Sequence, residues 1–168
     1  PSGASLSAGT LANGVWTLAA ADLAGLTLTP AENFNGQIAL TVTATATEAD
    51  TGDIATSTAS LSVTVDAVND APDAVDGLSF RTIQGAPVTI AASTLLDGAT
   101  DADGDAVSIQ SVGNAQNGTV VLNGDGSVTF TPDVGYFGPA SFDITVTDGN
   151  GGSDVATVDI DSVDNEAP

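Results

Sequence analysis

The sequence of 168 residues contains no cysteine, no histidine and only one basic residue, Arg81. Without these side chains the usual nucleophilic and acid–base catalytic groups cannot be assembled, so we expect a protein that is not an enzyme. Disulfide bonds are excluded too. A secreted protein can instead be held together by metal ions, so the absence of cysteine does not decide the cellular compartment.

The near absence of positive charge also restricts the partners that the chain can bind. Nucleic acids and anionic membranes are bound by clustered Lys and Arg, so we expect no nucleic-acid partner. No apolar run approaches the roughly 18 residues that span a membrane, and we expect no membrane insertion. No cleavable signal segment with a basic start is present, so we expect export to be directed from elsewhere in a longer chain.

Acidic residues are abundant, and their type and position indicate a cation. The net charge is -21, and nineteen of the 22 acidic residues are aspartate. Aspartate suits turns, and its carboxylate is a preferred ligand of calcium. A halophilic surface would also be acidic, but it would not need carboxylates gathered at the ends of a repeat. The composition therefore predicts Ca²⁺ as the cofactor.

The chain contains an internal repeat. The segment LTLTPAENFNG at 26–36 matches VTFTPDVGYFG at 128–138, and each follows an NG turn and a strand that begin at Asn13 and Asn117. Asn117 lies 45 residues after Pro72, whereas only 12 residues precede Asn13, so about 30 residues of the front half have no counterpart in the first copy. We expect the first copy to be truncated, completed by a partner segment, or split in sequence.

Between the turns, apolar residues recur with a period of two, as in Ile38, Leu40 and Val42, which is typical of half-buried strands. No stretch predicts a long helix, although 20–26 and 92–98 each predict one helical turn. The pattern predicts an all-β fold, with a Greek-key β-sandwich of seven short strands in the second copy. Those strands are expected near 78–84, 87–91, 106–112, 118–123, 127–131, 141–147 and 154–162.

Three segments resemble those of bacterial cadherin-like repeats, which build giant secreted adhesins. They are the VNDAP linker at 68–72, the DADGD loop at 101–105 and the DGNGG turn at 148–152. Residues 1–68 are similar to the extender domains that neighbour such repeats in RTX-type adhesins. The resemblance implies two tandem immunoglobulin-like β-sandwiches: an extender domain at 1–68, a calcium-binding linker at 69–72, and a cadherin-like repeat with an outgoing linker at 73–168.

The resemblance also implies where calcium binds. In cadherins the ion lies at the junction of successive domains, and the linker and DxD motifs of this chain match those ligands. Alternating strand direction places the loops 97–105, 123–126 and 148–153 at one end of the sandwich, with Asp125 among the acids there. Each loop could instead be an ordinary turn that binds nothing. The predicted metal ligands are Asp66, Asn69, Asp70, Asp101, Asp103, Asp105, Asp148, Asn150 and Asp154.

These features together predict a calcium-rigidified extender of a large secreted adhesin attached to the bacterial cell surface. Its partners would be neighbouring repeats of the same chain, and a host or surface ligand would be bound only through other domains. Two alternatives remain: a β-sandwich that binds a carbohydrate or peptide ligand, and an accessory domain of a secreted hydrolase. An aromatic-rimmed pocket would favour the first, and a catalytic domain elsewhere in the parent chain the second.

Overall fold

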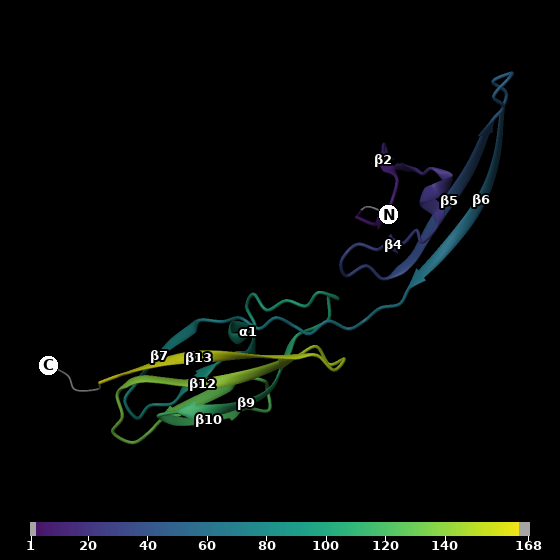
Figure 1. The fold of residues 1–168 in the computed structure, drawn as a ribbon. Helices are drawn as coiled ribbons and strands as arrows, with labels where there is room; N and C mark the ends of the chain where they lie inside the picture. Colours follow the sequence, from purple (N-terminus) through teal and green to yellow (C-terminus); the bar gives the residue numbers. More distant parts are fainter. Residues whose placement is uncertain (1–2, 165–168) are drawn as a thin grey trace. The chain divides into compact units, whose positions relative to one another are not determined.

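A computed structural model describes residues 3–164 and confirms the all-β prediction. The chain divides into two compact units, Pro1–Val68 and Asn69–Pro168 (Figure 1). Asn69 and Asp70, predicted as part of a separate linker, belong to the second unit. The last residues of the predicted outgoing linker, 165–168, lie outside the described residues. Over the described residues, no helix has the length and apolar character that a membrane span needs.

The second unit is a sandwich of two sheets. One sheet has the strand order β7-β13-β12-β9 and the other β10-β11-β8, with the helical turn α1 (Ala92–Leu95) between β8 and β9. Strands β7 and β13 are parallel, and the other pairs are antiparallel. The strands are β7 (Leu78–Ile83), β8 (Val88–Ile90), β9 (Ser108–Gln116), β10 (Gly118–Leu122), β11 (Val128–Pro132), β12 (Gly138–Thr147) and β13 (Ser153–Val163).

All seven strands predicted for this unit are present, although some boundaries were wrong. Strand β9 runs on to Gln116, four residues beyond its predicted end, because the chain stays paired with β12 across the irregularity in the register between Ser141 and Asp143. The strand ends at Gln116 because an NG turn follows it. Asn117 adopts a positive φ of 60°, which asparagine tolerates better than most residues. Gly118 is needed because a Cβ there would collide with the ring of Phe130.

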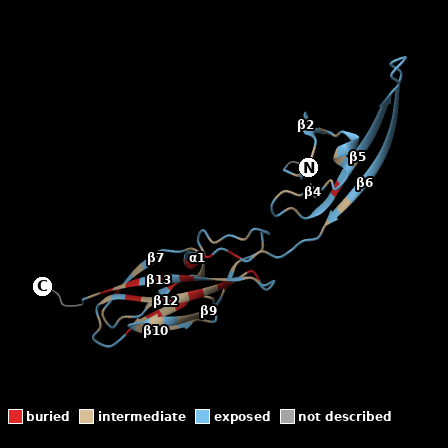
Figure 2. Ribbon diagram, in the orientation of Figure 1, coloured by how far each residue is buried: buried red, intermediate tan, exposed pale blue. Residues whose placement is uncertain are grey.

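The core of the second unit lies between its two sheets (Figure 2). Alternate residues of β12 and β13 point inward, among them Phe142, Ile144 and Val158, which are fully buried. The ring of Phe142 stacks on Phe130 of the opposite sheet with centroids 5.8 Å apart. Leu95 of α1 is also fully buried and belongs to the same cluster. The apolar residues that recur with a period of two in the sequence therefore form one continuous layer between the two sheets.

The first unit has less core. Its described residues form three two-stranded sheets, β1-β4, β2-β3 and β5-β6, and a short 3-10 helix, η1 (Ala20–Leu23). Ile38 is the one buried hydrophobic residue among the described residues of this unit. The strands are β1 (Ser5–Leu6), β2 (Thr10–Ala12), β3 (Val15–Thr17), β4 (Leu28–Thr29), β5 (Gly36–Thr47) and β6 (Ile54–Val65).

The packing of Phe142 yields a direct test. Phe142→Ala leaves a cavity against Phe130 and should lower the free energy of unfolding of the second unit by about 3–5 kcal/mol. Phe137→Ala is the matched control, since Phe137 is 59% exposed and its loss should cost less than about 1 kcal/mol. Urea unfolding followed by circular dichroism measures both. Equal losses from the two variants would show that the cluster between the sheets does not dominate stability.

Candidate metal centre

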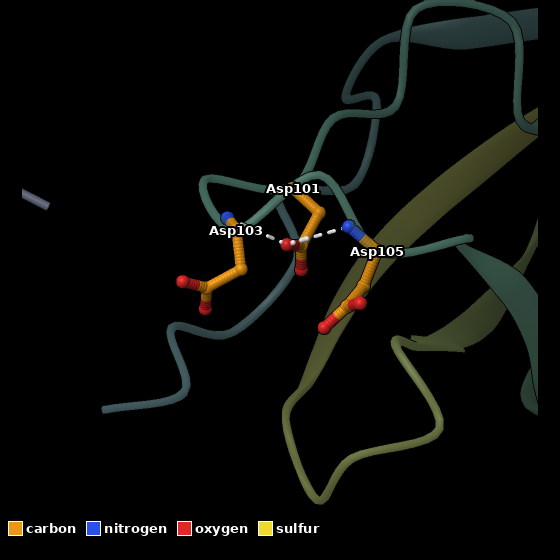
Figure 3. A group of neighbouring side chains, drawn as sticks. All are labelled: Asp101, Asp103 and Asp105. Carbon is orange, nitrogen blue, oxygen red and sulfur yellow. Dashed lines mark hydrogen bonds between the residues drawn. The ribbon is translucent and has the colours of Figure 1, made fainter. Parts of the chain in front are cut away.

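Three aspartates converge in the loop between α1 and β9. Carboxylate oxygens of Asp101, Asp103 and Asp105 lie within 4.8 Å of one another (Figure 3). The loop folds around the first of them, because Oδ1 of Asp101 accepts the backbone N–H of Asp103 at 2.9 Å and that of Asp105 at 3.2 Å. Gly104 turns the chain with a φ of +83°, a conformation that glycine adopts without strain.

The second carboxylate oxygen of Asp101 is the most informative atom of the site. This Oδ2 is buried and has no hydrogen-bond partner in the part of the chain that the structure describes. A buried, unpaired carboxylate oxygen is unfavourable, so native structures nearly always provide it with a partner. An oxygen that neighbours two further carboxylates suits a hard divalent cation, and the donor set therefore fits calcium.

No positively charged side chain is available to neutralise this cluster. Arg81 is the only Lys or Arg in the sequence, and its Nε lies 3.2 Å from Asp161 of β13. Both side chains of that pair are at least half exposed. The three aspartates of the loop are consequently held together without a compensating cationic side chain from the protein.

The residues that begin the second unit are bound to the same region. The backbone N–H of Asp70 donates to Oδ2 of Asp103 at 2.7 Å, and the amide of Asn69 donates to Oδ2 of Asp148 at 2.7 Å. A further contact joins the two loops, because the amide of Asn150 donates to Asp105 at 2.7 Å. The aspartate loop, the 148–152 turn and residues 69–70 thus form one hydrogen-bonded network.

Asp148 organises the turn between β12 and β13. Its Oδ1 accepts the N–H groups of Asn150 at 2.7 Å and Gly152 at 3.0 Å, and the residue is only 7% exposed. The hydrogen bond from Asn69 is the main reason that the pKa of Asp148 lies below its ordinary value, and burial opposes it. Gly152 must be glycine, because a Cβ would lie 2.8 Å from the backbone of Ala71.

The structure brings together seven of the nine predicted ligands in this network: Asn69, Asp70, Asp101, Asp103, Asp105, Asp148 and Asn150. Asp154 makes a separate contact, in which its Oδ2 accepts the backbone N–H of Ala74 at 2.9 Å. Asp66 follows β6 in the first unit and is exposed. Whether any of the nine binds metal stays a prediction.

Two features of the region were not predicted from the sequence. Asp125, expected among the acids at this end of the sandwich, accepts the backbone N–H and the hydroxyl of Ser127 in its own turn, a contact that was not foreseen from the sequence. The close approach of Ala71 to Gly152 was missed as well. The two successive glycines that follow Asn150 are the sequence signal for it, since glycine without a turn requirement often marks a close backbone approach.

Comparison with known proteins gives a family and a set of distant structures. Residues 68–162 match the model of the cadherin-like domain. None of the curated proteins compared with the chain matches it. The chain is similar to the endo-fucoidan hydrolase MfFcnA4 of glycoside hydrolase family 107, at 19% identity and a TM-score of 0.42, over 84% of this chain and 20% of that chain. The endo-fucoidan hydrolase MfFcnA9 of the same family is similar at 14% identity and a TM-score of 0.35, over 95% of this chain and 28% of that chain. The chain thus spans less than a third of the length of either protein.

The contact between Asn69 and Asp148 can be tested by titration in calcium-free buffer. Asn69→Ala removes the amide donor, so the pKa of Asp148 should rise toward its ordinary value. Because the folded-state pKa is lowered, the stabilisation from this carboxylate is complete above the ordinary pKa of 3.8 and is lost as the pH falls through the lowered value. Carboxyl-carbon NMR measures the shift.

The control for this titration is Ser127→Ala, which removes the hydroxyl that chiefly lowers the pKa of Asp125. It should raise the pKa of Asp125 and leave that of Asp148 unchanged. A pKa of Asp148 that does not respond to Asn69→Ala would show that residue 69 is not bound to the turn in solution.

Proposed function

This chain belongs to the cadherin-like domain family, and on that premise we propose that it is a calcium-rigidified extender segment of a large secreted bacterial surface adhesin. The observation that carries the proposal is the buried, unpartnered Oδ2 of Asp101 beside the carboxylates of Asp103 and Asp105. The chain would space and stiffen its parent protein, while ligands of host or surface origin would be bound by other domains.

Asp101, Asp103 and Asp105 are the residues that would hold the ion. Calcium takes six to eight oxygen ligands in flexible geometry, from carboxylates, backbone carbonyls and water, whereas magnesium requires a strict octahedron and retains most of its water. A loop that presents three carboxylates, one of which has a buried oxygen, favours calcium for this reason. Calcium would also supply the positive charge that the side chains of this region lack.

The mechanical role follows from the residues hydrogen-bonded to the cluster. Asn69 and Asp70 come directly after Val68, the last residue of the first unit, and they contact the 148–152 turn and the aspartate loop. Without a cation the loop carboxylates repel one another, which weakens the contact between Asp103 and residue 70. With calcium, the loop becomes a fixed acceptor for that backbone N–H, and the connection between the two units becomes stiffer.

Calcium binding can be separated from general charge screening. Asp103→Asn should weaken calcium binding about tenfold or more, because it removes a ligand charge. Asp159→Asn, which makes the same charge change on an exposed position of β13, should leave the affinity nearly unchanged. Isothermal titration calorimetry measures both affinities. For the unaltered chain, calcium at 100 times its Kd should add about 2.7 kcal/mol of stability. An equal loss of affinity in the two variants would indicate diffuse counterion binding.

Stiffening of the connection is a second expected outcome. Small-angle scattering of the whole chain should give a narrower distribution of intramolecular distances in calcium than in EDTA, while far-ultraviolet circular dichroism stays the same. Asp103→Ala should broaden the distribution in calcium, because it removes the carboxylate that accepts the backbone N–H of Asp70. Magnesium at matched ionic strength is the control. Identical distributions in calcium and EDTA would mean that calcium acts inside the second unit without restraining the connection.

A further inference from the structure

The two long hairpins of the chain are counterparts in sequence and register. The internal repeat aligns Gly36 with Gly138, the first residues of β5 and β12. Each strand pairs antiparallel with the next strand along the chain, β6 or β13. Three successive apolar pairs of the first hairpin therefore correspond to three of the second: Ile38↔Val63 to Ala140↔Ile160, Leu40↔Leu61 to Phe142↔Val158, and Val42↔Ala59 to Ile144↔Ala156.

These equivalent positions differ sharply in burial. Phe142, Ile144 and Val158 are 0% exposed, whereas Val42 and Leu61 are each 52% exposed. Residues directly opposite in an antiparallel pair point to the same side, so Val42 and Leu61 lie on one apolar face with Ile38. Figure 2 shows the difference as buried segments along β12 and β13 and an almost entirely exposed β5 and β6. The first hairpin thus presents a core face that is covered only near Ile38.

The second unit shows what covers such a face. Ile90 of β8 and Leu95 of α1 belong to the core cluster that contains Phe142 and Val158. Strand β7 pairs with the outer edge of β13, from Leu78 beside Val158 to Ile83 beside Val163. Phe130 of β11 also packs on Phe142, but Ile90, Leu95 and strand β7 all lie within 73–104. Aligning Asn13 with Asn117 places Pro1 opposite Asp105, so none of the residues 1–68 corresponds to 73–104.

The edges of the first hairpin are also open. Strands β5 and β6 are twelve residues long, and neither contains a charged residue or a proline. Over residues 3–164, no other strand pairs with either outer edge. Exposed edges of native sheets are usually protected by charge, proline or short length, because unpaired N–H and C=O groups recruit another strand. An unprotected edge beside an uncovered apolar face is therefore a surface that another strand completes.

We propose that the face of β5 and β6 around Val42 and Leu61, together with the outer edge of β6, is a docking surface for a polypeptide segment of the same kind as 78–95. This segment adds one strand parallel to β6, as β7 does to β13, and places a second strand and a helical turn over the exposed apolar face. It carries alternating apolar residues and few charges. A second copy of the chain fits less well, because its own residues 78–83 are already paired and both copies carry a net charge of -21.

The test uses the full chain with a second copy of residues 73–104 joined to its N-terminus, which restores the order of the repeat. Hydrogen exchange with mass spectrometry should show amides of β6 exchanging about tenfold more slowly than in the unextended chain, because the added strand pairs with them. Exchange in β13 should not change. The control carries Phe80→Asp and Leu95→Asp in the added copy only, which places charge in the covering segment, and protection should be lost.

Two results would overturn the proposal. One is unchanged exchange of β6 in the extended chain. The other is a dimer of the unextended chain, seen by light scattering, in which β6 is already protected, since the occupant would then be a second copy. Neither result bears on calcium binding by Asp101, Asp103 and Asp105, so the proposed function is tested separately by the calcium affinity of the chain.

Discussion

The antiparallel pairing of β12 with β13 is the constraint on which the second unit depends. Ten residue pairs, from Gly138↔Ser162 to Thr147↔Ser153, fix the register without an irregularity. Because side chains alternate along a strand, this register sends Phe142 and Ile144 into the core. It also places Asp148 at the tip of the hairpin, where Asn69 donates to it. A slip of one residue would expose the core face and would move the turn away from the start of the unit.

The acidic chain holds its carboxylates with neutral donors. Asp101 accepts two backbone N–H groups of its own loop, Asp148 accepts the amide of Asn69 as well as backbone donors, and Asp154 accepts the N–H of Ala74. Hydrogen bonds to charged groups are stronger than those between neutral groups, so this arrangement stabilises the loops. It does not remove the charge. The carboxylates are therefore oriented by the fold and remain able to bind a cation.

The sequence predicted the strands and the loops more reliably than the roles of individual side chains. Period-two patterning and NG turns are local signals, so all seven strands of the second unit could be located before the structure. The connection of Asp154 to Ala74 spans 80 positions along the chain, and no local pattern reveals it. The hydrogen bonds of Asp125 are local by contrast, since its carboxylate accepts the backbone N–H and the hydroxyl of Ser127, two residues away. The sequence showed that residues 1–68 contain no counterpart of 73–104, but the exposure of Val42 and Leu61 required coordinates.

The single basic residue has a consequence for proteolysis. Trypsin cleaves after Lys or Arg, and the whole sequence offers it only the bond between Arg81 and Thr82. That bond lies inside β7, paired in parallel with Asp161 and Ser162 of β13. A protease needs an extended, unpaired segment in its active site, so cleavage requires β7 to leave the sheet. The rate of tryptic cleavage therefore reports the opening of this one strand pair, with no competing site elsewhere in the chain.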